Sequence, residues 1–202
     1  MSIKSSPSAR TRRSPEAARE NILAAAETLL VDRGPQSLKL ADVAQAAGVA
    51  NATVLHHFGS IDGVQTALME RMIAQLVERI LAVAPAEDLA ALRENHLQAL
   101  FDCFETRGAA RLAAWLELTG EWRRLTSVRA AVQEVVARII GRTGAQASKA
   151  EDMVLVGVAL AMGVGLFGRP LATLMGKPAG HTRALAEDLL RLQSQLAWEG
   201  AR

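Results

Sequence analysis

The chain has 202 residues, half of them apolar, and is therefore long enough to bury a core in one or two compact domains. Aromatic residues make up only 3% of it and tyrosine is absent, so the composition argues against a sheet protein and favours an all-α fold with many alanines and leucines. The formal net charge is +2, and because residues 61–202 hold equal numbers of acidic and basic side chains, all of the excess positive charge lies in residues 1–60, where it could meet a polyanion.

A single cysteine, Cys103, excludes an internal disulfide and suits a reducing compartment. The basic residues near the N-terminus are not followed by the apolar segment of a signal peptide. We therefore expect a cytoplasmic protein.

Residues 1–13 form a basic segment without apolar periodicity, too polar to fold alone. It is either a solvated tail or an arm that settles in the minor groove or along the phosphates of DNA. On the second interpretation its candidate DNA contacts are Arg10, Arg12 and Arg13.

Residues 14–34 carry clear signals for a helix. Ser14 is a hydroxyl cap, Pro15 suits the first helical position, and Gly34 followed by Pro35 ends the helix. We expect its apolar stripe to form one wall of a small core, and Arg19 on its outer face to be solvated. The stripe consists of Ile22, Ala25, Ala26, Leu29 and Leu30.

Residues 38–60 predict two short helices joined by a tight turn. The first has an apolar stripe that ends before Gly48, a residue that readily adopts the left-handed backbone of a helix C-terminus. The second begins near Asn51 and buries Val54 and Phe58 one turn apart. Such a pair is a helix-turn-helix, whose second helix enters the major groove of DNA.

The exposed N-terminal half of this second helix supplies the candidate base contacts. Asn51 can bond an adenine edge through its amide, or it can cap the helix; Ala52 and Leu55 can touch thymine methyl groups. The candidate phosphate contacts are Thr53, His56 and His57, of which His57 could equally be a packed residue. Adjacent histidines do not share a helix face, so we expect no metal site and no cofactor.

In this region the chain resembles the DNA-binding domain of the TetR family of bacterial transcriptional regulators. The resemblance covers about the first third of the chain and implies an all-α protein with an N-terminal three-helix helix-turn-helix domain and a C-terminal helical domain that binds a ligand and dimerises. The matching elements are Val43-Ala44, Ala47-Gly48-Val49, Thr53-Val54, His57-Phe58, Ser60 and Asp62.

Three positions depart from the family pattern. The family usually has a tyrosine in place of Leu55 and a lysine in place of Ile61, and both of those residues normally reach phosphates. It usually has serine or threonine in place of Lys39. We expect Lys39 to restore one phosphate contact near the start of the first helix of the pair.

Residues 61–83 predict a longer helix with an apolar residue every four positions, from Val64 to Ile80. The resemblance implies that this helix links the DNA-binding domain, residues 14–60, to the body and that its tilt transmits the ligand state. Ala84-Pro85 closes it, and residues 84–202 are expected to be the regulatory and dimerisation domain.

The body reads as five or six helices, and a family-like body would enclose a ligand cavity. Its large side chains are the candidate walls, although ordinary core packing explains each of them as well. The candidate ligand-binding residues are His96, Phe101, Phe104, Trp115, Trp122, Met153 and Phe167.

Residues 153–167 contain no polar side chain but fall short of the roughly 20 residues that cross a bilayer, so we expect a buried helix and no membrane contact. Gly157, Ala161 and Gly165 recur every four residues and would let another helix approach closely. The chain is expected to turn at Arg169-Pro170 and again at residues 176–178.

The last predicted helix, residues 182–198, has a leucine stripe formed by Leu185, Leu189, Leu192 and Leu196. Together with Gly157, Ala161 and Gly165 it predicts a homodimer interface in which two helices of each subunit form a four-helix bundle. The alternative is an intramolecular core.

These features predict a homodimeric, ligand-responsive regulator that binds double-stranded DNA. As a repressor it would leave a palindromic operator when a small apolar effector binds the body. The alternatives are a regulator that has lost its effector or answers to a protein, and a helical carrier or enzyme. An enzyme would need polar catalytic groups converging in the body, and the sequence shows none, so we expect no catalytic residues.

Overall fold

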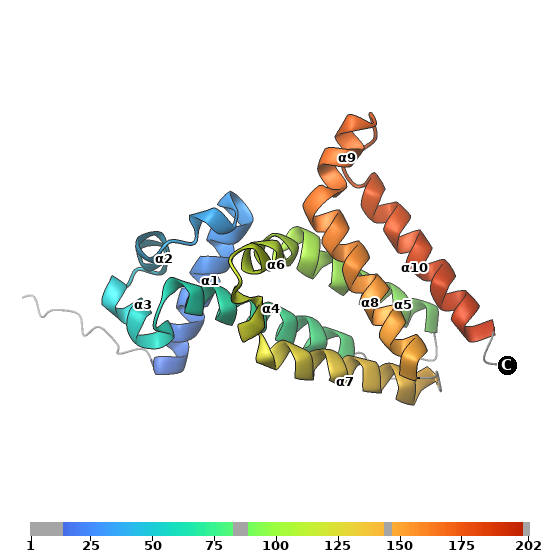
Figure 1. The fold of residues 1–202 in the computed structure, drawn as a ribbon, viewed down its shortest axis with the longest axis horizontal. Coiled ribbons are helices and arrows are strands. Elements are labelled where there is room, and N and C mark those ends of the chain that lie inside the picture. Colours follow the sequence, from blue (N-terminus) through green and yellow to red (C-terminus); the bar gives the residue numbers. More distant parts are fainter. Residues whose placement is uncertain (1–13, 83–88, 144–146, 200–202) are drawn as a thin grey trace, which may run out of the picture.

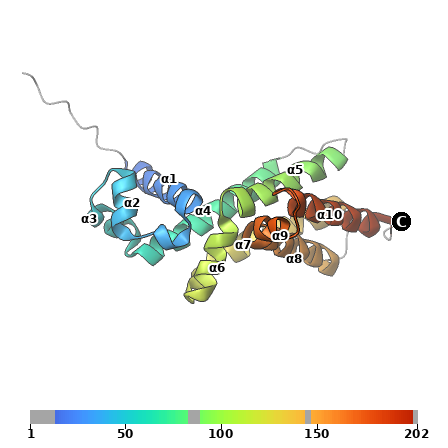
Figure 2. The ribbon, with the colours of Figure 1, turned by 90° about the horizontal axis from the view of Figure 1, so that it is seen from above.

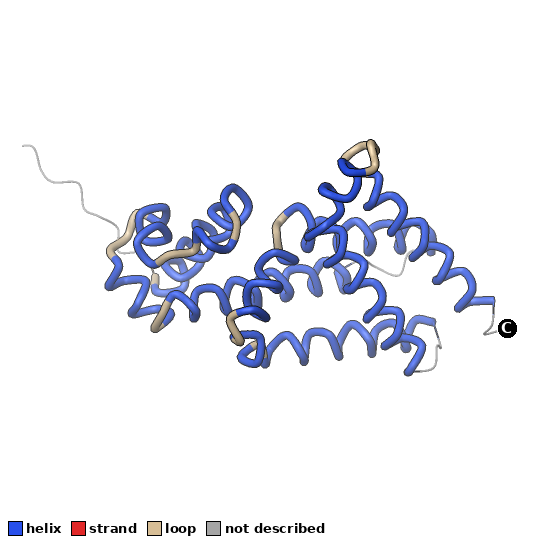
Figure 3. Tube along the Cα trace, turned by 45° about the horizontal axis from the view of Figure 1, so that its top comes forward, coloured by secondary structure: helices blue, strands red, loops and turns tan. Residues whose placement is uncertain are grey.

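The computed structural model describes residues 14–82, 89–143 and 147–199, and within these ranges the chain forms helices and connecting turns without a strand. The predicted all-α fold is confirmed. The molecule is elongated, with α1–α3 at one end, α5–α10 at the other and α4 running between them (Figures 1 and 3). The α-helices are α1 (Pro15–Arg33), α2 (Leu40–Ala47), α3 (Asn51–Phe58), α4 (Ile61–Ala82), α5 (Leu89–Phe101), α6 (Ala109–Leu118), α7 (Thr126–Thr143), α8 (Ala147–Gly163), α9 (Arg169–Leu174) and α10 (His181–Glu199).

The helix boundaries predicted for the N-terminal unit are confirmed. The Ser14 hydroxyl accepts a hydrogen bond from the Ala17 amide at 3.1 Å, which satisfies one of the free donors at the start of α1. Gly48 has φ +66° and ends α2, and the Val49 amide donates to the Ala44 carbonyl at 3.0 Å. This turn lets α3 pack against α2.

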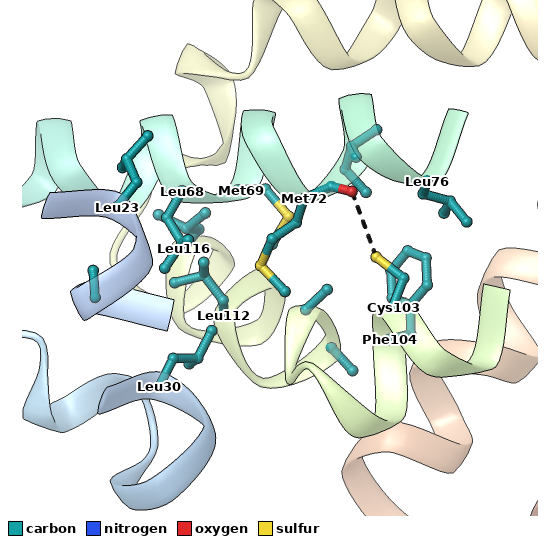
Figure 4. Close-up of a cluster of buried hydrophobic side chains, with 14 of the residues drawn as sticks. Leu23, Leu30, Leu68, Met69, Met72, Leu76, Cys103, Phe104, Leu112 and Leu116 are labelled. Carbon is teal, nitrogen blue, oxygen red and sulfur yellow. Dashed lines mark hydrogen bonds between the residues drawn. The ribbon is translucent and has the colours of Figure 1, made fainter. Parts of the chain in front are cut away.

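The core continues from α1 into the body without a gap. Leu30 of α1, Leu68 and Met72 of α4, and Leu112 and Leu116 of α6 are all fully buried in one cluster (Figure 4). The α4 helix therefore contributes to the packing of both ends of the molecule, and the N-terminal unit shares its hydrophobic core with the body.

Two helices of the body contain π turns that the sequence did not predict. The end of α5 continues into η2 (Asp102–Thr106), and the end of α8 continues into η4 (Val164–Gly168). The two π turns pack against each other at Gly165, where a β-carbon would lie 2.7 Å from both the Phe104 carbonyl oxygen and the Ala110 β-carbon. A glycine is required at this close contact.

The turn predicted at Arg169-Pro170 is wrong. The helix continues there as α9, because a proline in the first turn of a helix has no N–H donor to leave unpaired. The chain reverses at residues 175–180, and α10 then returns beside α8, as Figures 1 and 2 show.

The expectation of a buried helix at residues 153–167 is wrong for one of its sides. The continuous helix Ser148–Leu174 is long and apolar enough to cross a membrane by length and composition, and only 22% of its most apolar window is buried. Ala161 and Val164 face the body, whereas Leu155, Phe167 and Leu171 are exposed. One side of this helix is therefore a free apolar surface in the single chain.

Candidate nucleic-acid interface

The α3 helix presents its N-terminal half to solvent. Val54 is fully buried beneath it, while Asn51, Ala52, Leu55 and His56 are exposed. The N-cap position is Ala50, whose side chain makes no capping hydrogen bond, so the first amides of α3 keep their positive partial charge without a side-chain acceptor. An exposed helix start of this kind suits a phosphate group, and the side chains beside it can reach base edges.

Two side chains of α1 hold the helix-turn-helix in place. The Arg19 guanidinium lies 4.4 Å from the centre of the Phe58 ring and donates to the His57 carbonyl oxygen at 3.2 Å. The Asn21 amide donates to the Ala47 carbonyl oxygen at 2.7 Å and so closes the end of α2. Arg19 remains exposed, as expected, but the sequence did not predict its contacts with residues 38 and 39 positions further along the chain.

The predicted DNA contacts that fall in the described residues lie on α3 and at the residue before α2. Asn51 is the first residue of α3, so the alternative in which it caps the helix is wrong. Thr53 and His57 are half-buried, and Lys39 is exposed at the residue before α2. The predicted contacts of the basic segment, Arg10, Arg12 and Arg13, lie outside the described residues.

The structure does not bring the predicted ligand-binding residues into one cavity, and this prediction needs correction. Phe101 and Phe104 are packed in the closed core, whereas Trp122 and Phe167 are exposed. The remaining three, His96, Trp115 and Met153, are half-buried, and His96 Nε2 lies 3.1 Å from the Ile80 carbonyl oxygen. Small residues at the contact of η2, α6 and η4 let these elements approach so closely that Phe104 fills the space between them, and no room for a ligand is left there.

A different hollow lies between α4 and α7. It is an open groove of about 480 Å³ with a mainly apolar lining and two carboxylates at its edge. Its lining residues are Ala74, Val77, Glu78, Leu81, Ala82, Ala131 and Glu134. The sequence gives no sign of this groove, because alanine, valine and leucine do not mark a binding site by type and Glu78 and Glu134 look like ordinary surface charges.

The predicted dimer residues divide into two groups. Leu185, Leu189 and Leu192 are exposed on α10, each with more than half of its surface accessible, and the side chain of Leu196 lies outside the described residues. The prediction that the three small residues of α8 and η4 belong to the dimer interface needs correction, because they face the chain's own body. Gly157 lies beside Leu100, Gly165 lies beside Phe104, and Ala161 is fully buried. The free side of this helix carries Leu155, Ala159, Gly163, Phe167 and Leu171 instead.

The residues that the structure describes contain no group of three or more His, Cys, Asp or Glu side chains placed to hold a metal ion. Cys103 is buried, and burial raises the pKa of its thiol from 9.0 to about 11, so the sulfur is neutral at physiological pH.

Comparisons with known proteins agree with this geometry. Residues 22–68, which include all of α2 and α3, match the family described as bacterial regulatory proteins, tetR family. An uncharacterized HTH-type transcriptional regulator of Mycobacterium tuberculosis, recorded in two strains, is 33% identical over 109 residues. That match covers 52% of this chain, and the chain spans about half (51%) of the length of these relatives.

Solved structures match most of the chain. A TetR-family transcriptional regulator from Streptomyces coelicolor has a TM-score of 0.62 at 19% identity, with 89% of this chain and 99% of that chain covered. A transcriptional regulator from Rhodococcus sp. Rha1 has a TM-score of 0.63 at 21% identity, with 93% and 97% covered. The multidrug binding protein EbrR in complex with ethidium has a TM-score of 0.59 at 20% identity, with 87% and 98% covered. At these identities the structures establish a common fold.

Proposed function

We propose that this chain is a TetR-family regulator, a cytoplasmic, homodimeric repressor that binds a palindromic DNA operator and leaves it when a small molecule binds the body. The observation that carries the proposal is the exposed N-terminal half of α3, which lies within the segment that matches the family.

In this proposal α3 reads the major groove. The Asn51 amide bonds an adenine edge, and Ala52 and Leu55, the latter 41% exposed, contact thymine methyl groups. Lys39, Thr53, His56 and His57 contact the phosphates, together with Arg10, Arg12 and Arg13 of the segment that precedes α1. The family's usual tyrosine is replaced by Leu55, so this position contributes base contact rather than a phosphate contact.

The dimer would form through the free apolar surface of α8, η4, α9 and α10. Because α8 and α10 bury their opposite sides against the body, this surface faces away from it. Leu155, Phe167 and Leu171 are exposed in the single chain, as are Leu185, Leu189 and Leu192 of α10. Ala159 and Gly163 would allow close helix approach. Two copies joined here would form the four-helix bundle and present two recognition helices to two half-sites.

The groove between α4 and α7 is the best candidate for the effector in the described part of the chain. An effector there would touch the C-terminal half of α4, the helix that also packs against α1 and α3, and could therefore change its tilt. Solved structures of the same fold include EbrR with ethidium and TetR from Acinetobacter baumannii with minocycline. The apolar lining suits a small, mostly apolar molecule.

Selection from a randomised pool of DNA duplexes tests this proposal, with the bound sequences read for the wild type and for variants. Asn51→Ala should relax the preference for adenine at one position of each half-site and weaken binding by about 1–3 kcal/mol. The matched control is Asn95→Ala, an exposed asparagine on α5, which should select the wild-type sequences. Wild-type and Asn51→Ala proteins that select identical sequences would remove Asn51 from the interface.

A further inference from the structure

Glu27 of α1 binds one arginine of α4 and one arginine of the body. Its carboxylate lies 2.6 Å from Arg71 Nη2 of α4 and 2.6 Å from Arg107 Nε, directly after η2. All three side chains are at least three-quarters buried. Arg107 also donates to the Gln75 side chain of α4 at 2.6 Å, so one carboxylate ties together α1, α4 and the end of η2. This hydrogen bond with Glu27 is the main cause that raises the pKa of Arg107.

The connection between α5 and α6, residues 102–111, is called the α5–α6 corner below, and it contacts α1 at a second point. Arg111, in the first turn of α6, donates to the Val31 carbonyl oxygen at 3.2 Å. Val31 follows Glu27 by one helical turn, and Gly108 between Arg107 and Arg111 lies against Leu30. The α5–α6 corner therefore contacts α1 at Glu27 and again one helical turn later at Val31. Two contacts along a helix constrain its direction as well as its position.

The other end of η2 is tied to α10. Asp102, its first residue, lies 3.3 Å from Arg183 of α10 and 3.7 Å from Arg79 of α4. The Arg107 amide donates to the Asp102 carbonyl oxygen at 2.9 Å, which is the i→i+5 bond of a π turn. If the π turn moved along the helix by one residue, Arg107 would rotate relative to Asp102 by about 100°. The ion pair of Arg107 with Glu27 and that of Asp102 with Arg183 could then not both be kept.

The contacts of Glu27 with α4 and with the corner can separate. Arg71 also donates to Glu20 at 3.2 Å and to the Leu23 carbonyl oxygen at 3.0 Å, so it stays bound to α1 when Arg107 leaves. Glu27 likewise keeps Arg71 as a partner. Release of the corner therefore leaves Glu27 and Arg71 paired with each other, and the charge that loses its ion pair with Glu27 is that of Arg107, which lies at the edge of the buried group.

We propose that Glu27 is a positioning residue through which the α5–α6 corner, tied to α10 by Asp102, sets the direction of the DNA-binding unit, as a second path beside α4. The path runs from α10 through Arg183, Asp102, η2, Arg107 and Glu27 to α1. Its role in DNA binding rests on the function proposed above, whereas the positioning itself is a property of a single chain.

The test measures the distance between two spin labels in one chain, by pulsed electron paramagnetic resonance. The labels sit on exposed positions of the N-terminal unit and of α10, Ala46→Cys and Ala184→Cys, in a Cys103→Ala background, with excess unlabelled protein added so that only distances within one chain are recorded. The variants are Arg107→Met and Glu27→Gln. The matched control is Glu20→Gln, which removes a carboxylate from the same helix that binds Arg71 but does not reach η2.

We expect Arg107→Met and Glu27→Gln to broaden or shift the distance distribution, the double variant to match the larger single effect, and Glu20→Gln to match the wild type. Distributions that are the same in all variants, or effects that add in the double variant, would overturn the proposal. Because Arg107→Met leaves the pair of Glu27 and Arg71 in place, it decides the question even where Glu27→Gln disturbs folding.

DNA affinity supplies the second readout. With the DNA-binding unit less constrained, a smaller fraction of molecules holds the binding orientation, so Arg107→Met should lower the affinity for a selected duplex by about tenfold, within the range typical of coupled sites. Glu20→Gln should stay within about twofold of the wild type. An unchanged affinity in Arg107→Met would overturn the link to DNA binding. A wild type that binds no duplex would instead refute the proposed function, and the label distances would still decide the positioning role.

Discussion

At the scale of single residues, Cys103 shows how burial sets the chemistry of a side chain. In the structure it is 1% exposed, its sulfur lies 3.8 Å from the Met72 carbonyl oxygen, and apolar side chains of α4 and η2 surround it (Figure 4). Burial is the main reason that the pKa of its thiol rises from 9.0 to about 11.

This raised pKa predicts a loss of stability at alkaline pH. The thiol of the unfolded chain ionises above pH 9.0, whereas the folded thiol stays neutral up to about pH 11, so the folded state binds more protons in this window and its stability falls as the pH rises. Between these pH values the wild type should lose about 2 kcal/mol more unfolding free energy than Cys103→Ala. Urea unfolding of both proteins from pH 7 upwards measures this, and curves that run parallel throughout would contradict it.

Sequence patterns predicted the residues whose partners are close in the chain. Ser14 and Gly48 act as helix ends because their hydrogen bonds join neighbouring residues. The roles of Arg19 and Glu27 were not predictable in this way. Their partners lie 38 and 80 residues away. A charged residue on the polar face of a predicted helix does not indicate which distant group it contacts in the fold.

At the scale of elements, the start of α3 is the most informative. Ala50 has the extended backbone of an N-cap residue without an acceptor side chain, so α3 lacks the stability of a side-chain cap at the end that we propose faces DNA. Unsatisfied amides at a helix start favour an anion, and the phosphate backbone of DNA would provide one.

This arrangement predicts opposite effects on folding and binding for one substitution. Ala50→Asp should raise the unfolding free energy by about 1 kcal/mol, because its carboxylate caps α3, and should weaken DNA binding, because it repels the phosphates. Ala50→Ser is the uncharged control, which should stabilise the fold with a smaller loss of affinity. Thermal unfolding and fluorescence anisotropy with a selected duplex give the two quantities. Equal DNA affinities of the Asp and Ser variants would show that no phosphate lies near this helix start.

Periodicity predicted where most helices lie but not their local geometry. The π turns η2 and η4 arise because Gly165 permits a contact with the Phe104 carbonyl that two regular helices would not form. Pro170 is accommodated in the first turn of α9, which follows η4 directly. Neither feature has a signal in the sequence, because each follows from the packing of elements about 60 residues apart.

At the scale of the whole molecule, the apolar face of α8, η4, α9 and α10 is the largest feature that a single chain leaves unexplained. The sequence predicted that this pair of helices dimerises, and three of the leucines that it named on α10, Leu185, Leu189 and Leu192, are exposed. The small residues that it named on α8 and η4 face the body instead, because Gly157, Ala161 and Gly165 and the opposite stripe have the same spacing and only the fold decides which one faces the body.

The proposed interface predicts that a single charge on this face separates the subunits. Leu189 is 57% exposed on α10 and would be buried on both subunits of a symmetric dimer. Leu189→Asp would therefore place two charges in the interface and should weaken dimerisation by at least about a hundredfold. Leu118→Asp is the control, since Leu118 is 84% exposed at the end of α6, away from this face. Sedimentation velocity at micromolar concentration measures both. Dimers of equal strength in the two variants would place the interface elsewhere.

The measurement that tests the central claim most directly is the stoichiometry of the complex with a duplex recovered from the randomised selection, determined by native mass spectrometry. The account predicts two chains on one duplex whose sequence contains inverted half-sites with centres roughly 34 Å apart. A protein that stays monomeric at micromolar concentration and retains no duplex from the pool would contradict it.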